Sequence, residues 1–367
     1  MDIVQTPVRI SSTGGVERYV HDLASELESQ GHTVIVICSQ SRDTIIHDSR
    51  YSTKMLTPVL RIANTEITPF LLPALISQKF DLIHTHIPTP WSADFSLLAS
   101  LIKKKPLVVT YHNDIKAYGR YAILAAFYNR IFLPLVLKRA GTIIITRTRY
   151  QSPFLRKYSQ KCIHIPPGVN PEHFRPGIYP KLGDLFFLSV LDEYHKYKGI
   201  ETLFLAIQRL KSRVPKILAI IGGSGELREH YQKKAEEMGI SSNVLFAGYV
   251  PDTDLPRYYC GTSVFVLPST DPTREGFGLV LLEAMACGTP VITTDIAGMA
   301  DDIREFQTGI IIQRGSAESL AEAIGWFMEN TKESEEMGKA ARRLIEQRYD
   351  WNVITARMVK VYEQLIR

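Results

Sequence analysis

Two glutamates flank a glycine-opened helix start in the second half of the chain. Glu275 precedes Gly276 and Gly278, and Glu283 lies one helical turn beyond the start of the apolar run. Glycine lets a backbone approach a ligand closely, and the free N–H groups of a helix N-terminus attract an anion. A carboxylate tolerates a nearby phosphate when it accepts hydrogen bonds from hydroxyl groups. The segment therefore predicts a site for a ligand that carries both a diphosphate and hydroxyls.

The elements around this segment place it at the edge of a sheet. Residues 264–267 are a short apolar strand before the loop, and residues 291–294 are another strand after the helix. Gly288 and Pro290 end the helix between them. Ligands of parallel α/β sheets gather at the carboxyl ends of strands, where this loop lies. That context favours a site over the alternative, an ordinary amphipathic helix with a solvated Glu283.

Six further segments extend the pattern along the chain. They are Thr13–Arg18, Gly31–Val34, Thr110–Asp114, Ile165–Asn170, Lys198–Gly199 and Ile221–Gly225. Together with residues 275–290, in this order, they resemble the motifs of retaining GT-B glycosyltransferases of family 4. The resemblance implies two Rossmann-like, doubly wound parallel-sheet domains that face a cleft. It also implies a C-terminal helix, residues 351–367, that crosses back to the first domain.

The same resemblance implies a role for individual residues. Glu275 would contact the donor sugar, and Glu283 would bind the ribose. His112 would hydrogen-bond the donor sugar or its reacting centre, and Lys198 would stabilise the leaving diphosphate, where negative charge grows. We expect the donor site to consist of Gly14, Gly15, Lys198, Gly223, Val250, Glu275, Gly276, Phe277, Gly278, Leu279 and Glu283.

Structural interpretations of these residues remain open on pattern alone. A lone His at a strand end, such as His112, is more often a structural residue. The pair Gly14-Gly15 also suits a tight strand-to-helix turn, and Lys198 alone would be a solvated lysine. Their order along the chain favours the site. His84 and His86 lie near another strand end and are secondary candidates for contact with an acceptor.

One position departs from the family pattern. The family usually carries an Arg at the end of the strand before Lys198, where this chain has Val190. Neutralisation of a diphosphate by two cations is therefore in question. Lys196 and His195 lie in the longer insert that follows, and either is a candidate substitute.

No nucleophile is evident in the sequence. Glu275 would suit a double displacement, but the resemblance places it on the ring hydroxyls of the donor. We therefore expect front-face substitution, in which the leaving phosphate assists deprotonation of the acceptor. The nucleotide sugar is a substrate, so we expect neither a cofactor nor a metal.

The chain length suits two domains, and strands alternate with helices throughout 367 residues. A run rich in proline and glycine, residues 166–180, marks the linker between the two domains. We expect residues 1–175, with helix 351–367, to form an acceptor-binding domain, and residues 176–350 to form the donor-binding domain.

Charge is distributed unevenly between the two halves. Residues 1–170 carry 20 Lys and Arg against 11 Asp and Glu, a net charge of +9, and the remainder carries −4. The basic half contains no recognisable motif for reading base sequence. It also lacks the interleaved basic and aromatic residues with which proteins bind single-stranded nucleic acid. An anionic membrane surface or a diphosphate-linked lipid explains the asymmetry better. By the family resemblance, the expected acceptor is a glycan or a lipid-linked molecule. The apolar segment Tyr121–Leu137 is predicted as a core helix in preference to a membrane-surface helix.

Four single cysteines without paired spacing are expected to be buried thiols of a reducing compartment. Met1–Val4 is predicted to be a strand rather than part of a signal peptide, and no stretch suits a bilayer span. The expected location is cytoplasmic, with peripheral attachment to the inner face of the cell membrane. Two alternatives remain. One is a catalytically silent GT-B subunit that binds a nucleotide sugar or a partner enzyme, and the other is a nucleotide-sugar epimerase or a phosphorylase on a related fold.

Overall fold

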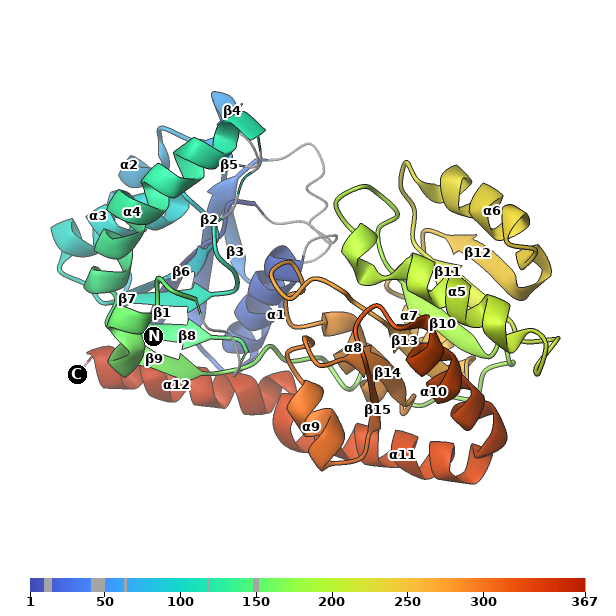
Figure 1. Cartoon of the computed structure of the whole chain (residues 1–367). Coiled ribbons are helices and arrows are strands. Elements are labelled where there is room, and N and C mark those ends of the chain that lie inside the picture. The colour runs from blue at the N-terminus through green and yellow to red at the C-terminus, as the bar shows by residue number, and fades with distance from the viewer. Residues whose placement is uncertain are drawn as a thin grey trace. The chain divides into compact units, whose positions relative to one another are not determined.

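The chain forms two compact units, which are seen in a computed structural model that describes residues 1–9, 15–40, 50–62, 65–115, 117, 119–147 and 152–366. The first unit contains Met1–Pro167 together with Trp351–Arg367, and the second contains Gly168–Asp350 (Figure 1). The division falls earlier than the expected 175/176 boundary. Val169 donates its N–H to the carbonyl of Tyr349 at 2.8 Å, and Phe174 is buried in the second core. These contacts place the proline-rich linker from Gly168 onward in the second unit.

The first unit is built on a parallel sheet of seven strands in the order β3-β2-β1-β6-β7-β8-β9. The strands are β1 (Asp2–Thr6), β2 (Thr33–Ser39), β3 (Ser52–Leu56), β6 (Leu82–Ile87), β7 (Leu107–Tyr111), β8 (Thr142–Ile145) and β9 (Cys162–His164). A separate antiparallel pair joins β4 (Leu60–Ile62) to β5 (Thr65–Ile67). Strand order reverses between β1 and β6, which is the position where doubly wound sheets bind ligands.

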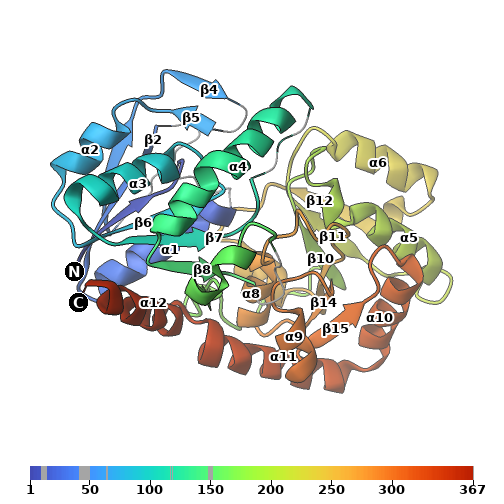
Figure 2. The same ribbon diagram turned by 60° about the vertical axis from the view of Figure 1, so that its left-hand side comes forward.

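Helices cover both faces of this sheet because successive strand side chains point to opposite sides. Ile3 packs with α1 (Gly15–Ser29) and α12 (Trp351–Ile366), whereas Val4 packs with the other face. That other face is covered by α2 (Leu71–Ser77), α3 (Ser92–Lys103) and α4 (Ala122–Arg139). Figure 2 shows the two groups of helices on either side of the strands.

The C-terminal helix α12 belongs to the first unit, as the sequence predicted. Its buried side chains recur at helical spacing, from Trp351 through Ile354 and Met358 to Tyr362, and they pack with α1. Full burial of one large apolar side chain stabilises a fold by about 1.5 to 3 kcal/mol. This stripe therefore anchors the end of the chain firmly to the first sheet.

Helix α4 corrects the prediction of a core helix for residues 121–137. Leu133, Val136 and Leu137 are buried, but one side of the helix carries large apolar side chains in solvent. Ile123 is 78% exposed, and the other large apolar side chains of α4 that are exposed are those of Leu124, Phe127, Ile131, Phe132 and Leu135. An apolar run has the same composition whether one face or both faces are covered, so the sequence did not distinguish the two cases. None of the described helices is long and apolar enough to span a bilayer.

The second unit repeats the architecture with a parallel sheet in the order β12-β11-β10-β13-β14-β15. Its strands are β10 (Leu185–Leu188), β11 (Ala219–Gly222), β12 (Val244–Gly248), β13 (Val264–Leu267), β14 (Val291–Thr294) and β15 (Gly309–Ile312). The order reverses between β10 and β13. Loops after these two strands carry the candidate residues described below.

Two helical layers enclose this second sheet. One layer consists of α5 (Ile200–Leu210), α6 (Arg228–Glu237) and α10 (Ala317–Glu329). The other consists of α7 (Leu255–Cys260), α8 (Leu279–Ala286), α9 (Ala300–Glu305) and α11 (Thr331–Leu344). Both units are thus doubly wound α/β domains, in agreement with the predicted fold class.

Candidate functional site

Lys198 and Glu275 form the central pair of the second unit. The Lys198 ammonium donates to both carboxylate oxygens of Glu275 at 3.0 Å, and Ser269 donates its hydroxyl to the same carboxylate. The Glu275 side chain is 1% exposed and that of Lys198 is 17% exposed. Two candidate residues that lie 77 positions apart in sequence therefore meet in one ion pair.

A tight backbone contact holds Lys198 beside this loop. Lys198 ends the 3₁₀ helix η3 (Lys196–Lys198), and Gly199 follows with φ of 84°. A Cβ on Gly199 would lie 2.2 Å from the carbonyl oxygen of Pro268, so only glycine fits there. Thr270 adds a backbone hydrogen bond to Tyr197 at 2.8 Å. The loop after β13 and the turn before α5 are thereby fixed against each other.

Helix α8 begins where the glycine loop predicts. Gly278 is its N-cap with φ of 84°, in the left-handed region that favours glycine, and Leu279 is the first helical residue. Gly276 has no positive φ. Phe277 between them is buried, and its carbonyl accepts the N–H of Gly298 at 3.0 Å. The loop places Glu275 before the helix and Glu283 within it, as the spacing predicted.

Glu283 is a buried carboxylate, and it is 4% exposed. Its Oε2 accepts a hydrogen bond from the hydroxyl of Tyr259 at 2.7 Å, and Tyr259 itself is fully buried on α7. A hydrogen bond to a charged acceptor is stronger than one between neutral groups. Tyr259 was not foreseen from the sequence, because nothing in the spacing connects it to α8. Val250, another predicted donor contact, is buried in the apolar core.

The glycine turn after β11 has a structural reason for its composition. A Cβ on Gly223 would lie 1.8 Å from the carbonyl oxygen of Ser189, and one on Gly225 would lie 2.2 Å from that of Leu191. The N–H of Gly223 already donates to the carbonyl of Gly248 at 2.7 Å. These glycines therefore allow two backbone segments to approach each other beside Val190.

The insert that follows Val190 contains two candidate substitutes for the family Arg, and they lie in different surroundings. Lys196 pairs with Glu193 at 2.7 Å, and both side chains are largely in solvent. His195 is less exposed, and its Nδ1 lies 2.7 Å from the carboxylate of Asp192. Val190 is 42% exposed and offers no charge.

Sequence reasoning missed Arg274, a cation directly before Glu275. Its guanidinium carbon lies 5.4 Å from the ring centre of Tyr194, and its Nε lies 3.6 Å from Asp271. The side chain is 27% exposed. Its position directly before the glycine loop could have identified it, but Arg274 belongs to none of the motifs recognised in the sequence.

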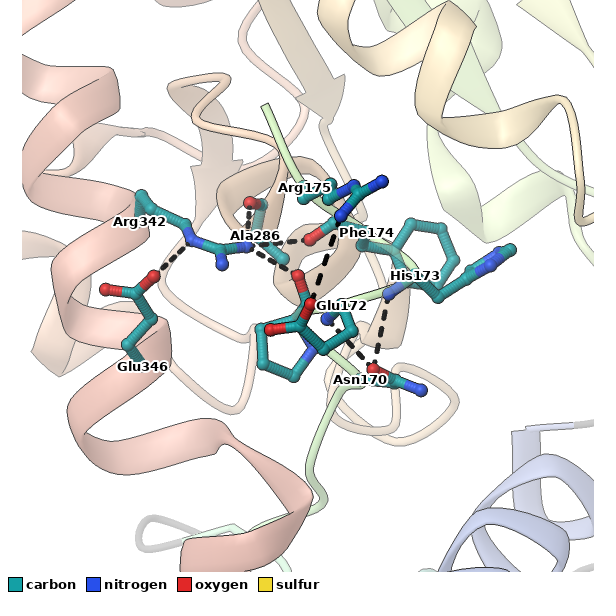
Figure 3. A network of polar contacts seen from close by, with 9 residues as sticks. Asn170, Glu172, His173, Phe174, Arg175, Ala286, Arg342 and Glu346 are labelled. Atoms are coloured by element: carbon teal, nitrogen blue, oxygen red, sulfur yellow. Dashed lines mark hydrogen bonds and ion pairs between the residues drawn. The ribbon is translucent and has the colours of Figure 1, made fainter. Parts of the chain in front are cut away.

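The structural role of Arg342 on α11 was also not predicted from the sequence. Its Nη1 donates to the carbonyls of Pro171, Phe174 and Ala286 at 2.9, 2.8 and 2.8 Å, and its Nε donates to Glu346 at 2.7 Å. Figure 3 shows the guanidinium between α11, the end of α8 and the linker. This contact fixes the helix that carries Glu283.

The first unit places His112 directly after β7, at the carboxyl end of the strand. Its Nε2 lies 3.3 Å from Nδ1 of His86 on β6, and the ring of Tyr19 meets it edge-on at 4.9 Å. Burial lowers the pKa of His112 to about 3. The imidazole is therefore neutral near pH 7.

His84 and His86, the secondary candidates for contact with an acceptor, lie in the interior of the first unit. Both are fully buried. The Nδ1 and Nε2 of His84 each lie 2.7 Å from a hydroxyl, of Tyr362 and of Thr110 respectively. Burial, and secondarily the nearby His112, lowers the pKa of His84 to about 3. Although three histidines gather here, the described residues contain no cluster suited to a metal ion.

The glycine pair before α1 is only partly visible. Gly15 is the first residue of α1, while Gly14 lies outside the described residues. The candidate residues that the structure describes in the first unit are therefore Gly15 and His112. In the second unit the central candidates are the Lys198–Glu275 pair and α8.

Two family profiles cover most of the chain. The profile described as "Glycosyltransferase Family 4" matches residues 13–173, and "Glycosyl transferases group 1" matches residues 172–344. The chain is 26% identical to the phosphatidyl-myo-inositol mannosyltransferase of Mycobacterium leprae, covering 97% of this chain and 95% of that protein. It is also 26% identical to the GDP-mannose-dependent alpha-(1-6)-phosphatidylinositol monomannoside mannosyltransferase of Mycolicibacterium smegmatis, covering 95% and 94%.

Solved structures share the fold over the full length. Sucrose-phosphate synthase from Thermosynechococcus elongatus matches with a TM-score of 0.77 at 23% identity, covering 100% of this chain and 99% of that one. HepE from Anabaena, in complex with UDP, matches with a TM-score of 0.81 at 19% identity, covering 100% of both chains. With both profiles and the doubly wound units, the chain belongs to the family 4 glycosyltransferases, a family of retaining, nucleotide-sugar-dependent hexosyltransferases with the GT-B fold.

Proposed function

We propose that this glycosyltransferase moves a hexose from a UDP- or GDP-sugar to a glycan or lipid-linked acceptor. The observation that carries the proposal is the Lys198–Glu275 pair beside the N-terminus of α8. A cation for the diphosphate and a carboxylate for the sugar hydroxyls are what a nucleotide sugar requires at adjacent positions. The name of the GDP-mannose-dependent relative supports a GDP-linked donor. The complex of HepE with UDP is compatible with a UDP-linked donor.

The donor residues take complementary roles in this proposal. Lys198 stabilises the leaving diphosphate, the amides of Gly278 and Leu279 support its oxygens, and Glu275 accepts from ring hydroxyls. Glu283 receives the ribose hydroxyls. The remaining proposed contacts come from Gly14, Gly15, Gly223, Val250, Gly276 and Phe277.

The ion pair gives Lys198 a defined resting state. Before the donor arrives, Glu275 compensates its charge at 3.0 Å. A bound diphosphate competes for the ammonium, while a sugar hydroxyl supplies a replacement hydrogen bond to Glu275. The exchange leaves neither buried charge without a partner, which limits the cost of donor binding.

His112 acts as a neutral hydrogen-bonding group in this scheme. Burial lowers its pKa to about 3, so the ring carries no charge for the diphosphate near pH 7. We propose that it orients a hydroxyl of the donor sugar. The bond between the anomeric carbon and phosphate oxygen breaks as the acceptor oxygen bonds on the same face, and a phosphate oxygen receives the acceptor proton.

His195 is the proposed substitute for the missing Arg. Asp192 holds its Nδ1 at 2.7 Å, which orients the ring and leaves Nε2 for a phosphate oxygen. Lys196 already pairs with Glu193 in solvent. Titration calorimetry with a nucleoside diphosphate tests this choice: His195→Ala weakens binding and Lys196→Ala, its neighbour, does not. The reverse order of effects would assign the role to Lys196.

The acceptor is proposed to lie in or on a membrane. Helices α3 and α4 contact each other, and both expose large apolar side chains. We call this the α3–α4 face; its apolar residues are Leu98, Leu101, Ile102, Ile123, Leu124, Phe127, Ile131, Phe132 and Leu135. Exposed apolar clusters of this kind mark interaction surfaces.

The basic residues near the α3–α4 face favour an anionic lipid surface as its partner. Helix α4 contains no Asp or Glu, and Arg130, Lys138 and Lys104 are exposed on the two helices or at their ends. Apolar side chains insert between lipid headgroups, and each nearby Lys or Arg adds about 1 kcal/mol on an anionic surface. The phosphatidylinositol-directed names of the relatives agree with a lipid-linked acceptor. We propose a cytoplasmic location at the inner face of the cell membrane.

A catalytically silent subunit is the second candidate, and Val190 is the observation that favours it. A panel of nucleotide sugars screened by thermal shift, followed by product analysis with the best binder, separates the two. Stabilisation by one donor together with transfer to a lipid or glycan acceptor supports the enzyme. Stabilisation without any turnover, in the presence of membrane extract as acceptor, would support the silent subunit.

A further inference from the structure

His86 is a fully buried imidazole that faces the proposed donor-binding histidine. Its Nδ1 lies 3.3 Å from Nε2 of His112, and the two rings are nearly parallel, with centroids 5.6 Å apart. Its other nitrogen, Nε2, is buried and has no hydrogen-bond partner among the described residues. The reaction proposed above does not use His86.

The short contact constrains both rings. Burial lowers the pKa of each imidazole, so both are neutral and each carries one N–H hydrogen. One nitrogen of the pair must donate and the other must accept. The position of a single hydrogen on His86 therefore determines which nitrogen of His112 carries its own hydrogen.

Two arrangements are available, and burial favours one of them. If His112 donated from Nε2, the hydrogen of His86 would move to its partnerless Nε2 and become a buried N–H without an acceptor. If His86 donates from Nδ1, its Nε2 keeps only a lone pair. Orphaned buried N–H groups are rarer in proteins than under-used acceptors.

We infer that His86 is a positioning residue that donates from Nδ1 to Nε2 of His112, so that His112 presents Nδ1–H as its free donor. Within the described residues Nδ1 of His112 has no hydrogen-bond partner, so this hydrogen remains available to a ligand. A sugar hydroxyl that meets His112 would then act as the acceptor. The functional consequence rests on the proposed role of His112, but the tautomer does not.

The test uses the full chain labelled with ¹⁵N-histidine, whose ring nitrogens report tautomers directly in long-range ¹H–¹⁵N spectra. His112→Asn identifies the His112 signals among those of the ten histidines. The inference expects wild-type His112 to carry its hydrogen on Nδ1. A wild-type spectrum with the hydrogen on Nε2 would overturn it, whether or not any variant folds.

Two variants at position 86 test the cause. His86→Phe removes the donor, so His112 should shift to a mixture of tautomers. His86→Asn can return an amide N–H near the lost Nδ1 and should restore the wild-type signal. His84→Phe is the matched control, because it removes another buried histidine of the same strand without removing a hydrogen bond to His112. An unchanged His112 signal in His86→Phe contradicts the inference.

Kinetics separate this inference from the proposed function. If both hold, His86→Phe lowers kcat about tenfold with a smaller change in KM, and His86→Asn recovers most of the loss. If the spectra behave as expected but wild-type protein transfers no sugar, the proposed function fails and the tautomer assignment stands. If wild type is active and His112 carries its hydrogen on Nε2, the positioning role fails alone.

Discussion

The Lys198 ammonium lies 3.0 Å from each carboxylate oxygen of Glu275, and this contact joins η3 to the loop before α8. Glu275 is almost fully enclosed, so the pair belongs to the interior of the second unit. Removal of either partner would leave the other charged group without its compensation. Ligand binding and stability are therefore coupled at this site.

Lys198→Ala should reduce both catalysis and stability. Loss of a positioned cation from a developing charge costs about 2 to 4 kcal/mol of transition-state stabilisation. The variant should also unfold more easily, by about 1 to 3 kcal/mol, because Glu275 loses a buried partner. Turnover and urea denaturation measure the two effects. Lys196→Ala, which removes a solvent-exposed cation nearby, is the control.

Adding Glu275→Gln to Lys198→Ala should recover most of the lost stability but none of the activity, because no buried charge then remains. Turnover of Lys198→Ala within a few-fold of wild type would show that another group carries the leaving-group charge. An additive stability loss in the double variant would contradict a coupled pair.

The two glutamates should separate in their effect on nucleotide binding. Glu275→Ala frees the Lys198 ammonium for phosphate, so affinity for free nucleoside diphosphate should hold or rise while transfer slows. Glu283→Ala removes the proposed ribose acceptor and should weaken the same binding. Titration calorimetry compares them, with Tyr259→Phe as a control that keeps the Glu283 carboxylate but removes its hydrogen bond. Loss of diphosphate binding in Glu275→Ala alone would reverse the assigned roles.

The α3–α4 face should bind anionic vesicles. Co-sedimentation should rise with the fraction of anionic lipid and fall with salt, because the Debye length shortens from about 10 Å at 0.1 M to about 3 Å at 1 M. The double variant Ile123→Ser, Phe127→Ser should bind less at every lipid composition. Leu245→Ser removes an exposed apolar side chain of the second unit and serves as the control.

Equal and negligible binding to neutral and anionic vesicles at low salt would contradict the proposed membrane binding. A chain that sediments as a dimer, and becomes monomeric in the double variant, would instead assign the face to a second copy. Neither result would change the family assignment.

Stability of the first unit should fall as the pH drops below about 6.5. Burial lowers the pKa of His84 and His112 to about 3, so the unfolded chain binds protons that the fold rejects between these values. The unfolding free energy therefore rises with pH across this window. Each such histidine contributes about 1.4 kcal/mol per pH unit well inside it. Burial also lowers the pKa of His86 well below its usual value. Urea titrations from pH 4 to 7 measure the slope, and His86→Asn should make it shallower.

The fold class could be predicted because each strand and helix is specified by residues that are close together in the sequence. Gly278 and Leu279 mark the start of α8 by composition alone, and the structure begins the helix there. The C-terminal helix could be assigned through the resemblance. Its Tyr362, however, meets His84 across 278 positions, and no local pattern specifies that contact.

The site was predicted residue by residue but not as a set of contacts. Lys198 and Glu275 were chosen for separate roles, and their ion pair emerges only when two loops meet in space. Tyr259 and Arg342 carry no motif, because any buried hydroxyl or guanidinium has the same appearance in sequence. The apolar run of α4 was misjudged because hydrophobicity alone does not reveal whether a neighbour covers it.

Product analysis with purified protein, a UDP- or GDP-hexose and a lipid or glycan acceptor tests the proposed transfer reaction itself. We expect release of nucleoside diphosphate and a product whose anomeric configuration, determined by NMR, equals that of the donor. Both should be lost in Lys198→Ala. An inverted product, or full activity in Lys198→Ala, would contradict the proposed mechanism. Absence of transfer with every donor and acceptor would contradict the proposed function itself.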